Sequence, residues 1–292
     1  MIKRLFTKQK MAIGALVAIA TTSVGVVAGA TYNHVRTSGS GGGAAVVACP
    51  GGMTRLGHPF DEQASVFPFD PAIHIEDLYT VAEDFFLVED IELGAHAGTH
   101  IDVPAHFIEG GRTLDDLAAE EFVWPAYKID VRDMELENNQ LSIDDIRDYE
   151  RENGRITRGS LVIIQTGAEE FYGLGGPHDE RIVDDDGLAQ NVDDLFAFDN
   201  KGFSGEAVQW LFDRRQIDGV GSDAYGPDAA NDANFDATFT ALANDGIALV
   251  ALANLDSVSV RSDVIMASAV PLTDGSGFST DPIACHGRPR GR

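Results

Sequence analysis

The chain has 292 residues, and 47 acidic against 21 basic side chains give it a formal net charge of −26 at pH 7. This length suffices for one large domain or two small ones. A surface this acidic repels nucleic acids and anionic membranes, which argues against both as partners. Because concentrated salt screens such self-repulsion, we interpret the acidity as a halophilic adaptation.

The N-terminus has the layout of an export signal. Residues 1–10 are basic, residues 11–30 carry no charge, and the small residues 28–30 offer a cleavage site. Residues 3–8, Lys-Arg-Leu-Phe-Thr-Lys, resemble a twin-arginine signal with lysine in the first position. The same uncharged run could also remain as an N-terminal anchor. We therefore expect residues 1–30 to export the protein to an extracellular, periplasmic or membrane-tethered location.

A Gly/Ser-rich linker is predicted at residues 31–52. The chain has two cysteines, Cys49 just after the Gly/Ser run and Cys285 close to the C-terminus. In an exported protein an even pair suggests a disulfide, here joining the two ends of the folded domain. In the chain-entropy model, a disulfide that closes so long a loop stabilises the folded protein by about 5 kcal/mol. Two unpaired thiols are the alternative.

Residues 53–292 are predicted to form one domain. Strands are expected at 85–92, 96–103, 161–166, 219–223 and 247–252, and helices at 114–121, 142–153, 204–215 and 237–244. Ser142 and Asp145 suit the N-cap and N3 positions of a capped helix. Strands and helices are mixed without a regular βαβ alternation, so the pattern predicts an α/β domain with a mixed sheet.

Residues 94–107 concentrate polar side chains on one face of a predicted strand. Successive side chains of a strand point to opposite faces, so His96, His100 and Asp102 would share a face and leave the other face apolar. Gly98 would leave room between the two imidazoles. Two imidazoles and a carboxylate can hold a cation. The other interpretation is a half-buried strand whose polar face meets solvent.

Residues 96–107, His-Ala-Gly-Thr-His-Ile-Asp-Val-Pro-Ala-His-Phe, resemble the signature H-x-G-T-H-x-D-x-P-x-H-F of the cyclase family. That family includes bacterial kynurenine formamidases and isatin hydrolases. The resemblance spans about residues 54–280, since Leu-Gly-His-Pro at 56–59 and Asn-Leu-Asp at 254–256 are similar to further family motifs. It implies the swivelling β/β/α fold and a homo-oligomer, either a dimer or a tetramer.

The resemblance also implies a chemistry. His96, His100 and Asp102 would bind one divalent metal ion, Mn²⁺ or Zn²⁺, and His106 would act as general acid/base. Such a metal lowers the pKa of bound water to roughly 7 and polarises a carbonyl group. A neutral His106 would take a proton from the water and return it to the departing amine. The implied reaction is hydrolysis of a C–N amide bond in a small molecule, an aryl formamide or a lactam such as isatin.

One departure from the family bears on the number of metal ions. Kynurenine formamidases complete a second metal site with a later His and Glu, and these places fall near Phe239 and Val250, which cannot bind a metal. We therefore expect a single ion. His58 is a candidate substrate-binding residue or a hydrogen-bonded structural histidine. Two other functions stay open: a catalytically degenerate metal-binding module, and a non-haem iron oxygenase in which His100, Asp102 and a distal His form a facial triad.

Overall fold

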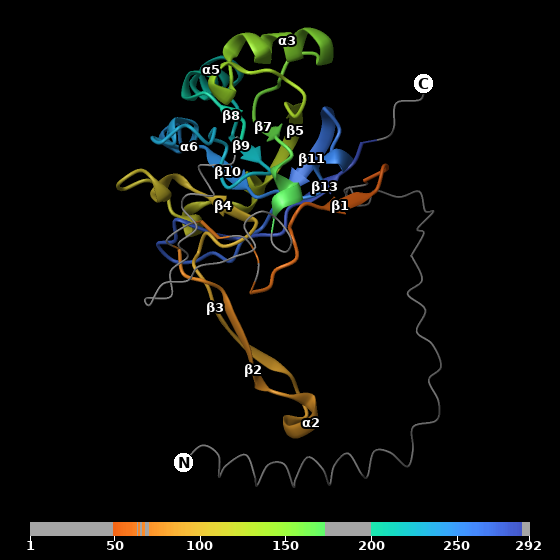
Figure 1. Cartoon of the computed structure of the whole chain (residues 1–292), viewed down its shortest axis with the longest axis vertical. Helices are drawn as coiled ribbons and strands as arrows, with labels where there is room; N and C mark the ends of the chain where they lie inside the picture. Colours follow the sequence, from red (N-terminus) through yellow and green to blue (C-terminus); the bar gives the residue numbers. More distant parts are fainter. Residues whose placement is uncertain (1–48, 63, 65, 68–69, 173–199, 288–292) are drawn as a thin grey trace, which may run out of the picture. The chain divides into compact units, whose positions relative to one another are not determined.

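A nine-stranded mixed sheet organises the chain (Figure 1). The computed structural model describes residues 49–62, 64, 66–67, 70–172 and 200–287, so the predicted export signal lies outside the described residues. The strand order is β1-β13-β11-β5-β7-β9-β10-β4-β12. The strands are β1 (Met53–Arg55), β4 (His100–Asp102), β5 (Val123–Asp130), β7 (Leu161–Gln165), β9 (Gly219–Ser222), β10 (Ile247–Val250), β11 (Arg261–Met266), β12 (Gly277–Ser279) and β13 (Ile283–Cys285).

The centre of the sheet is parallel and its flanks are antiparallel. β5, β7, β9 and β10 run in one direction, whereas β4 pairs antiparallel with both β10 and β12. The central strands are short, apolar and buried, as expected for parallel strands covered on both faces. The prediction of an α/β domain with a mixed sheet is confirmed, as are the strands expected at 161–166, 219–223 and 247–252.

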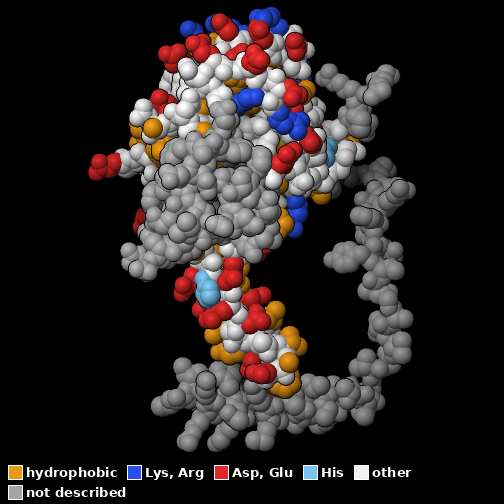
Figure 2. Space-filling view, in the orientation of Figure 1, with side chains coloured by type: hydrophobic (Ala, Val, Ile, Leu, Met, Phe, Trp, Pro, Cys, Tyr) orange, Lys and Arg blue, Asp and Glu red, His pale blue; other side chains and the backbone are white. Residues whose placement is uncertain are grey.

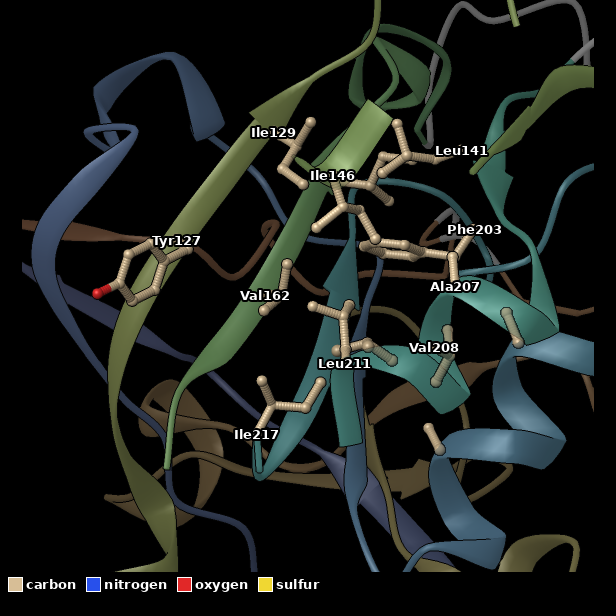
Figure 3. Close-up of a cluster of buried hydrophobic side chains, with 14 of the residues drawn as sticks. Tyr127, Ile129, Leu141, Ile146, Val162, Phe203, Ala207, Val208, Leu211 and Ile217 are labelled. Atoms are coloured by element: carbon tan, nitrogen blue, oxygen red, sulfur yellow. The ribbon is translucent and has the colours of Figure 1, made fainter. Parts of the chain in front are cut away.

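Helices cover one face of this sheet (Figure 1). α3 (Ile143–Asn153), α5 (Gly205–Arg215) and α6 (Asp236–Ala243) confirm three predicted helices, and Ser142 caps α3 by accepting from the Asp145 amide. Figure 3 shows the core beneath them, where Leu211 of α5 lies close to Val162 of β7. A second core fills the opposite face. Its members include Leu56, Ile101, Leu114, Trp124, Leu161 and Ile163.

Three predicted elements are wrong in extent or type. Residues 114–121 form two short 3₁₀ helices, Leu114–Asp116 and Ala119–Phe122, rather than one α-helix. Acidic side chains there accept from nearby backbone amides, which competes with helical hydrogen bonding. The strand expected at 96–103 is reduced to β4. Residues 95–96 form a turn, and Gly98 has a φ of +63° that no strand continues through.

The strand expected at 85–92 is shorter and belongs to a separate hairpin. β2 (His74–Tyr79) and β3 (Val88–Glu92) form a two-stranded sheet with the short helix α2 (Val81–Asp84) at its tip. Phe85 ends α2 in the left-handed conformation, which excludes it from β3. Residues 74–92, named the arm below, project away from the nine-stranded sheet (Figure 1). Another two-stranded sheet joins β6 (Gln140–Leu141) to β8 (Gly202–Phe203).

The two ends of the described chain are held together at one edge of the sheet. Cys49 and Cys285 form a disulfide, and β1 pairs with β13 beside it. His286 adds side-chain bonds, with Nε2 2.8 Å from Thr54 Oγ1 and Nδ1 2.9 Å from Asp263 Oδ2. All described residues belong to one compact unit. Within them, no helix is long and apolar enough to span a bilayer.

Candidate metal centre and active site

β4 directs the predicted ligands to the helix-covered face of the sheet. His100 pairs with Val250 and Asp102 with Ala248, and both partners belong to the core beneath the helices. Ile101, between the two polar residues, points into the opposite core. The alternation expected from the sequence is therefore confirmed within β4, and it places an imidazole and a carboxylate side by side.

A cavity of about 580 Å³ opens at the edge of the sheet where these residues lie. The parallel strands β7, β9 and β10 end at this edge, and β4, which runs the other way, begins there. Ligands of open α/β sheets bind outside the carboxyl ends of parallel strands. The lining residues include His96, His100, Asp102 and His106 from the signature segment, together with Ala168, Asp223 and Ala251, which follow the three parallel strands.

The imidazoles of His96 and His100 both approach one carboxylate oxygen of Asp102. Oδ1 of Asp102 lies 2.8 Å from Nδ1 of His96 and 3.2 Å from Nε2 of His100. Ligand atoms bound about 2.0–2.2 Å from one ion are separated by about 3 Å. Each of the two nitrogens is therefore spaced from Oδ1 as a neighbouring ligand atom would be, although His96 reaches its place from a turn and not from the predicted strand.

In both imidazoles the outer ring nitrogen, which points away from Asp102, already has a hydrogen-bond partner. Nδ1 of His100 lies 2.8 Å from the Gly98 carbonyl oxygen, which can only accept, so Nδ1 carries a proton and Nε2 is the ring nitrogen that faces Asp102 and would bind a metal ion. Nε2 of His96 lies 2.9 Å from the Ser276 hydroxyl and can donate to it, which leaves Nδ1 as the ring nitrogen that faces Asp102. Metal-binding histidines are usually held like this by outer partners. The donor set and its supports fit a divalent metal ion.

His106 lies next to this cluster but is more accessible. It ends the 3₁₀ helix Pro104–His106 and stacks on His96 with a centroid separation of 3.9 Å, and its side chain is exposed. Within the described residues, His96, Asp102 and His106 also offer ligand atoms that all lie within 4.8 Å of one another. The geometry thus allows His106 two roles, as a third imidazole ligand or as a base beside the ion.

Burial and neighbouring charges shift the pKa values of Asp102 and His100 in opposite directions. Burial alone would raise the pKa of Asp102, but the neighbouring His100 and His96 outweigh it and lower that pKa strongly. Burial would lower the pKa of His100, yet the Asp102 carboxylate raises it. Partial desolvation inside the cavity lowers the pKa of His106, and the imidazoles of His96 and His100 act in the same direction against the attraction of Asp102. Asp102 is thereby ionised, and His106 is neutral near pH 7.

The walls of the cavity combine aromatic rings with acidic side chains. Phe235 makes edge-on contacts with Phe67 and Phe107, at centroid separations of 6.1 and 6.2 Å. The carboxylates are engaged in holding loops: Asp223 accepts from the Thr166 and Gly167 amides, and Asp228 accepts from two amides at the start of α6. The rings therefore supply an apolar surface for a substrate, and these two acids shape the loops that carry it.

His58 lies behind the cavity wall. Its ring stacks on Tyr172, which lines the cavity, with centroids 3.6 Å apart and planes 9° apart. Burial lowers the pKa of His58 to about 4, and among the described residues its Nε2 finds no hydrogen-bond partner. His58 itself is not part of the lining. Its role in substrate binding stays a prediction, and the observed contact is with the aromatic wall.

Some site residues could not be predicted from the sequence. Ser276 is 180 positions from the histidine that it supports, and no local pattern connects them. Gly277, beside it, could carry no side chain, because a Cβ there would lie 2.7 Å from Cε1 of His96. Asp223 had a usable signal, since it is the last residue of the strand predicted at 219–223. Of the positions considered for a second metal site, Phe239 is exposed and Val250 is in the core, and neither lines the cavity.

The fold and site are those of an α/β protein with a mixed sheet and a His/Asp cluster at the carboxyl edge of its parallel strands. The chain belongs to the family described as "Putative cyclase", whose family model matches residues 54–229. The expected family and fold are confirmed.

Among relatives, the isatin hydrolase of Roseibium aggregatum is 28% identical over 223 residues, covering 73% of this chain and 80% of the relative. A kynurenine formamidase of Bacillus anthracis is 31% identical over 81 residues, 27% of this chain and 39% of that protein. The solved isatin hydrolase A of Labrenzia aggregata, bound to benzyl benzoate, has a TM-score of 0.66 at 25% identity, with 80% and 92% of the two chains covered. The present protein is a hydrolase of this family.

Proposed function

We propose that the protein is a metal-dependent amidohydrolase that cleaves the C–N bond of an aryl formamide or of a cyclic amide such as isatin. The observation that carries this proposal is the pair of imidazoles whose outer nitrogens are bonded to Gly98 and Ser276 while their inner nitrogens face Asp102. The similarity to isatin hydrolase and kynurenine formamidase supports the reaction type.

His96, His100 and Asp102 would hold one Mn²⁺ or Zn²⁺ ion, which when bound supplies a Lewis acid and an acidified water molecule. His106 borders the same cavity and is neutral near pH 7, so it can accept the proton of the attacking water. The same imidazolium then returns the proton to the departing nitrogen. Water is consumed, the C–N bond breaks, and a carboxylate and an amine are formed.

The cavity walls would bind the aromatic part of the substrate. Phe67, Phe107 and Phe235 form a cluster of edge-on rings that can contact a flat ring and exclude water from it. A single ion is favoured because Phe239 and Val250 offer no ligand atoms and neither lines the cavity.

We also propose that the hydrolase is exported and works as a homo-oligomer. The basic and then uncharged residues 1–30 support export, and the bond between Cys49 and Cys285 is of the kind that persists in oxidising compartments. Detection of the N-terminally processed protein outside the cytoplasm would support this. A full-length chain that remains in the cytoplasm would contradict it.

Two variants test the assigned roles. We expect His100→Ala to lose both bound metal and hydrolysis, and His106→Ala to retain the metal while turnover falls by at least about 100-fold. His74→Ala, on the exposed arm, is the control for removal of a histidine. Metal content is measured by elemental analysis, and turnover is measured with formanilides, N-formylkynurenine, isatin and simple lactones.

The outcomes separate the candidate functions. Loss of metal from His106→Ala would make His106 a ligand and contradict its role as base. A metal-loaded protein that hydrolyses none of the substrates would favour the degenerate binding module. Oxygen consumption that depends on iron would favour the oxygenase with its facial triad.

A further inference from the structure

The described lining of the cavity carries five carboxylates and no basic side chain. The acids are Asp70, Asp102, Asp223, Asp228 and Asp232, and no Lys or Arg is among the described residues that line the cavity. Asp228, whose pKa is raised to about 6 by burial, is still ionised at pH 7. A bound divalent ion would offset only two of these charges. The described walls therefore keep an excess of negative charge around the substrate.

This excess differs from the acidity of the protein surface. Figure 2 shows Asp and Glu side chains at the helical end of the molecule and along the arm, where water and salt reach them. In the cavity wall, Asp223, Asp228 and Asp232 are each no more than 8% exposed. Burial of a carboxylate is costly, and backbone amides hold these three by hydrogen bonds. Adaptation to salt accounts for exposed acids but gives no reason to bury them around a cavity.

Asp70 lies between the aromatic wall and the metal centre, and no residue that the structure describes donates a hydrogen bond to its carboxylate. Its backbone amide donates to the Phe67 carbonyl oxygen at 3.0 Å. Both residues line the cavity, so the carboxylate borders the aromatic wall that Phe67 helps to form. Burial raises the pKa of Asp70, and the imidazoles of His96 and His100 lower it. The Asp70 carboxylate is therefore also within the electrostatic field of the metal centre.

We propose that the cavity selects aryl amides and lactams that carry no carboxylate group, and that Asp70 is the residue that determines this specificity. The inference rests on the proposed function and narrows its substrate class. A neutral ring can occupy the aromatic wall without meeting a like charge, whereas a carboxylate on that ring would face the carboxylate of Asp70. At an effective dielectric constant of about 20, two like charges roughly 8 Å apart weaken binding by about 30-fold.

Asp70 is also the acid whose charge can be removed with least damage to the fold. Asp223 and Asp228 each accept from two backbone amides, and Asp232 accepts from the amides of two residues at the start of α6 and just before it. Substitution of these three would disturb the loops that they hold. Asp70→Asn removes a charge but breaks no hydrogen bond from a described residue, so it isolates the electrostatic effect.

Two aryl ketones of nearly equal shape test the selection, because a ketone presents a carbonyl group but cannot be hydrolysed. 4-Nitroacetophenone is neutral and 4-acetylbenzoate is anionic. Calorimetric titration of the metal-loaded full chain in 1 M salt, where the Debye length is about 3 Å, screens the exposed acids. We expect the wild type to bind the neutral ketone at least about 10-fold more tightly, and Asp70→Asn to reduce this ratio at least about fivefold. Glu109→Gln removes an exposed carboxylate outside the lining and should keep the wild-type ratio.

Binding is measured without turnover, so this inference and the proposed hydrolysis fail separately. Equal affinity of the wild type for the two ketones, tighter binding of the anion, or binding of neither ketone would overturn the selection. An unchanged ratio in Asp70→Asn, or the same reduction in Glu109→Gln, would overturn the role of Asp70. Loss of metal from Asp70→Asn, detected by elemental analysis, would make Asp70 a ligand and overturn that role too. If the selection holds while no amide or lactam is hydrolysed, the proposed function fails alone.

Discussion

His100 donates from Nδ1 to the carbonyl oxygen of Gly98, only two residues earlier and 2.8 Å away. The bond closes the turn that precedes β4 and selects one tautomer of the imidazole. Nε2 is then the ring nitrogen that faces Asp102 and that a metal ion would bind. A backbone carbonyl is a support that no side-chain substitution removes, so this ligand is oriented by the course of the chain.

His96 depends instead on a side chain. We expect Ser276→Ala to weaken metal binding by about 10–100-fold, because the hydroxyl that accepts from Nε2 of His96 is lost. Competition with a chelating dye measures the affinity. Ser257→Ala removes an exposed hydroxyl that does not line the cavity and is the control. Equal affinity of wild type and Ser276→Ala would show that this bond does not orient the ligand.

Gly98 combines a positive φ with a close neighbour. Its φ is +63°, and a Cβ would lie 2.8 Å from Oη of Tyr172. Gly110 has a φ of +73° with open space around it. Gly110→Ala should therefore show strain alone, about 1–2 kcal/mol, whereas Gly98→Ala should cost more and also displace the cavity wall.

Urea unfolding and substrate affinity test this pair of glycines. We expect the KM to rise for Gly98→Ala and to stay unchanged for Gly110→Ala. Similar losses of stability with no change in KM for either variant would mean that the Tyr172 contact is dispensable.

Glu150 and Arg215 predict a dependence of stability on pH. Burial alone would raise the pKa of Glu150, but its hydrogen bonds to Arg215, one of 2.6 Å, outweigh burial and lower the pKa. A carboxyl with a lowered folded-state pKa stabilises the protein above its unfolded pKa of 4.5 and loses this contribution as the pH falls through the folded pKa. Glu150→Gln should flatten the decline of stability in that acidic range.

The same substitution leaves Arg215 nearly buried without its charge partner, so we expect a loss of about 3 kcal/mol at neutral pH. Asp144→Asn, in an exposed pair with Arg147, should cost less than about 0.5 kcal/mol. Urea titrations between neutral and acidic pH supply both values. Equal costs for the two substitutions would show that burial adds nothing to the Glu150 pair.

The disulfide between Cys49 and Cys285 should stabilise the fold. It closes a loop with a sequence separation of 236, and its loss should lower the free energy of unfolding by up to about 5 kcal/mol. Cys49→Ser/Cys285→Ser should unfold at the same urea concentration as the reduced wild type. An unfolding midpoint that does not respond to reductant would contradict the stabilising role.

The capped helix Ile143–Asn153 and the buried central strands could be predicted because their signals are local. Side-chain alternation and capping residues report burial and hydrogen bonding within a few positions. The wrong predictions have local causes that the hydrophobic pattern does not indicate. Residues 114–121 carry acids that bond to nearby amides, and Gly98 turns the chain before β4 begins. The apolar residues near 85–92 predicted a strand, but they lie largely exposed on the arm.

For the site, the sequence by itself determined which residue types are available. The segment 96–107 contains the imidazoles of His96 and His100, the carboxylate of Asp102 and the separate His106. The tertiary structure decided how they are held and what surrounds them. Ser276 reaches His96 because β12 pairs with β4, and Asp223 joins the cavity because β9 ends at the same edge of the sheet. The pairing of strands that are far apart in the sequence depends on the formation of the whole sheet. The side-chain periodicity within one segment does not indicate which other strand that segment pairs with.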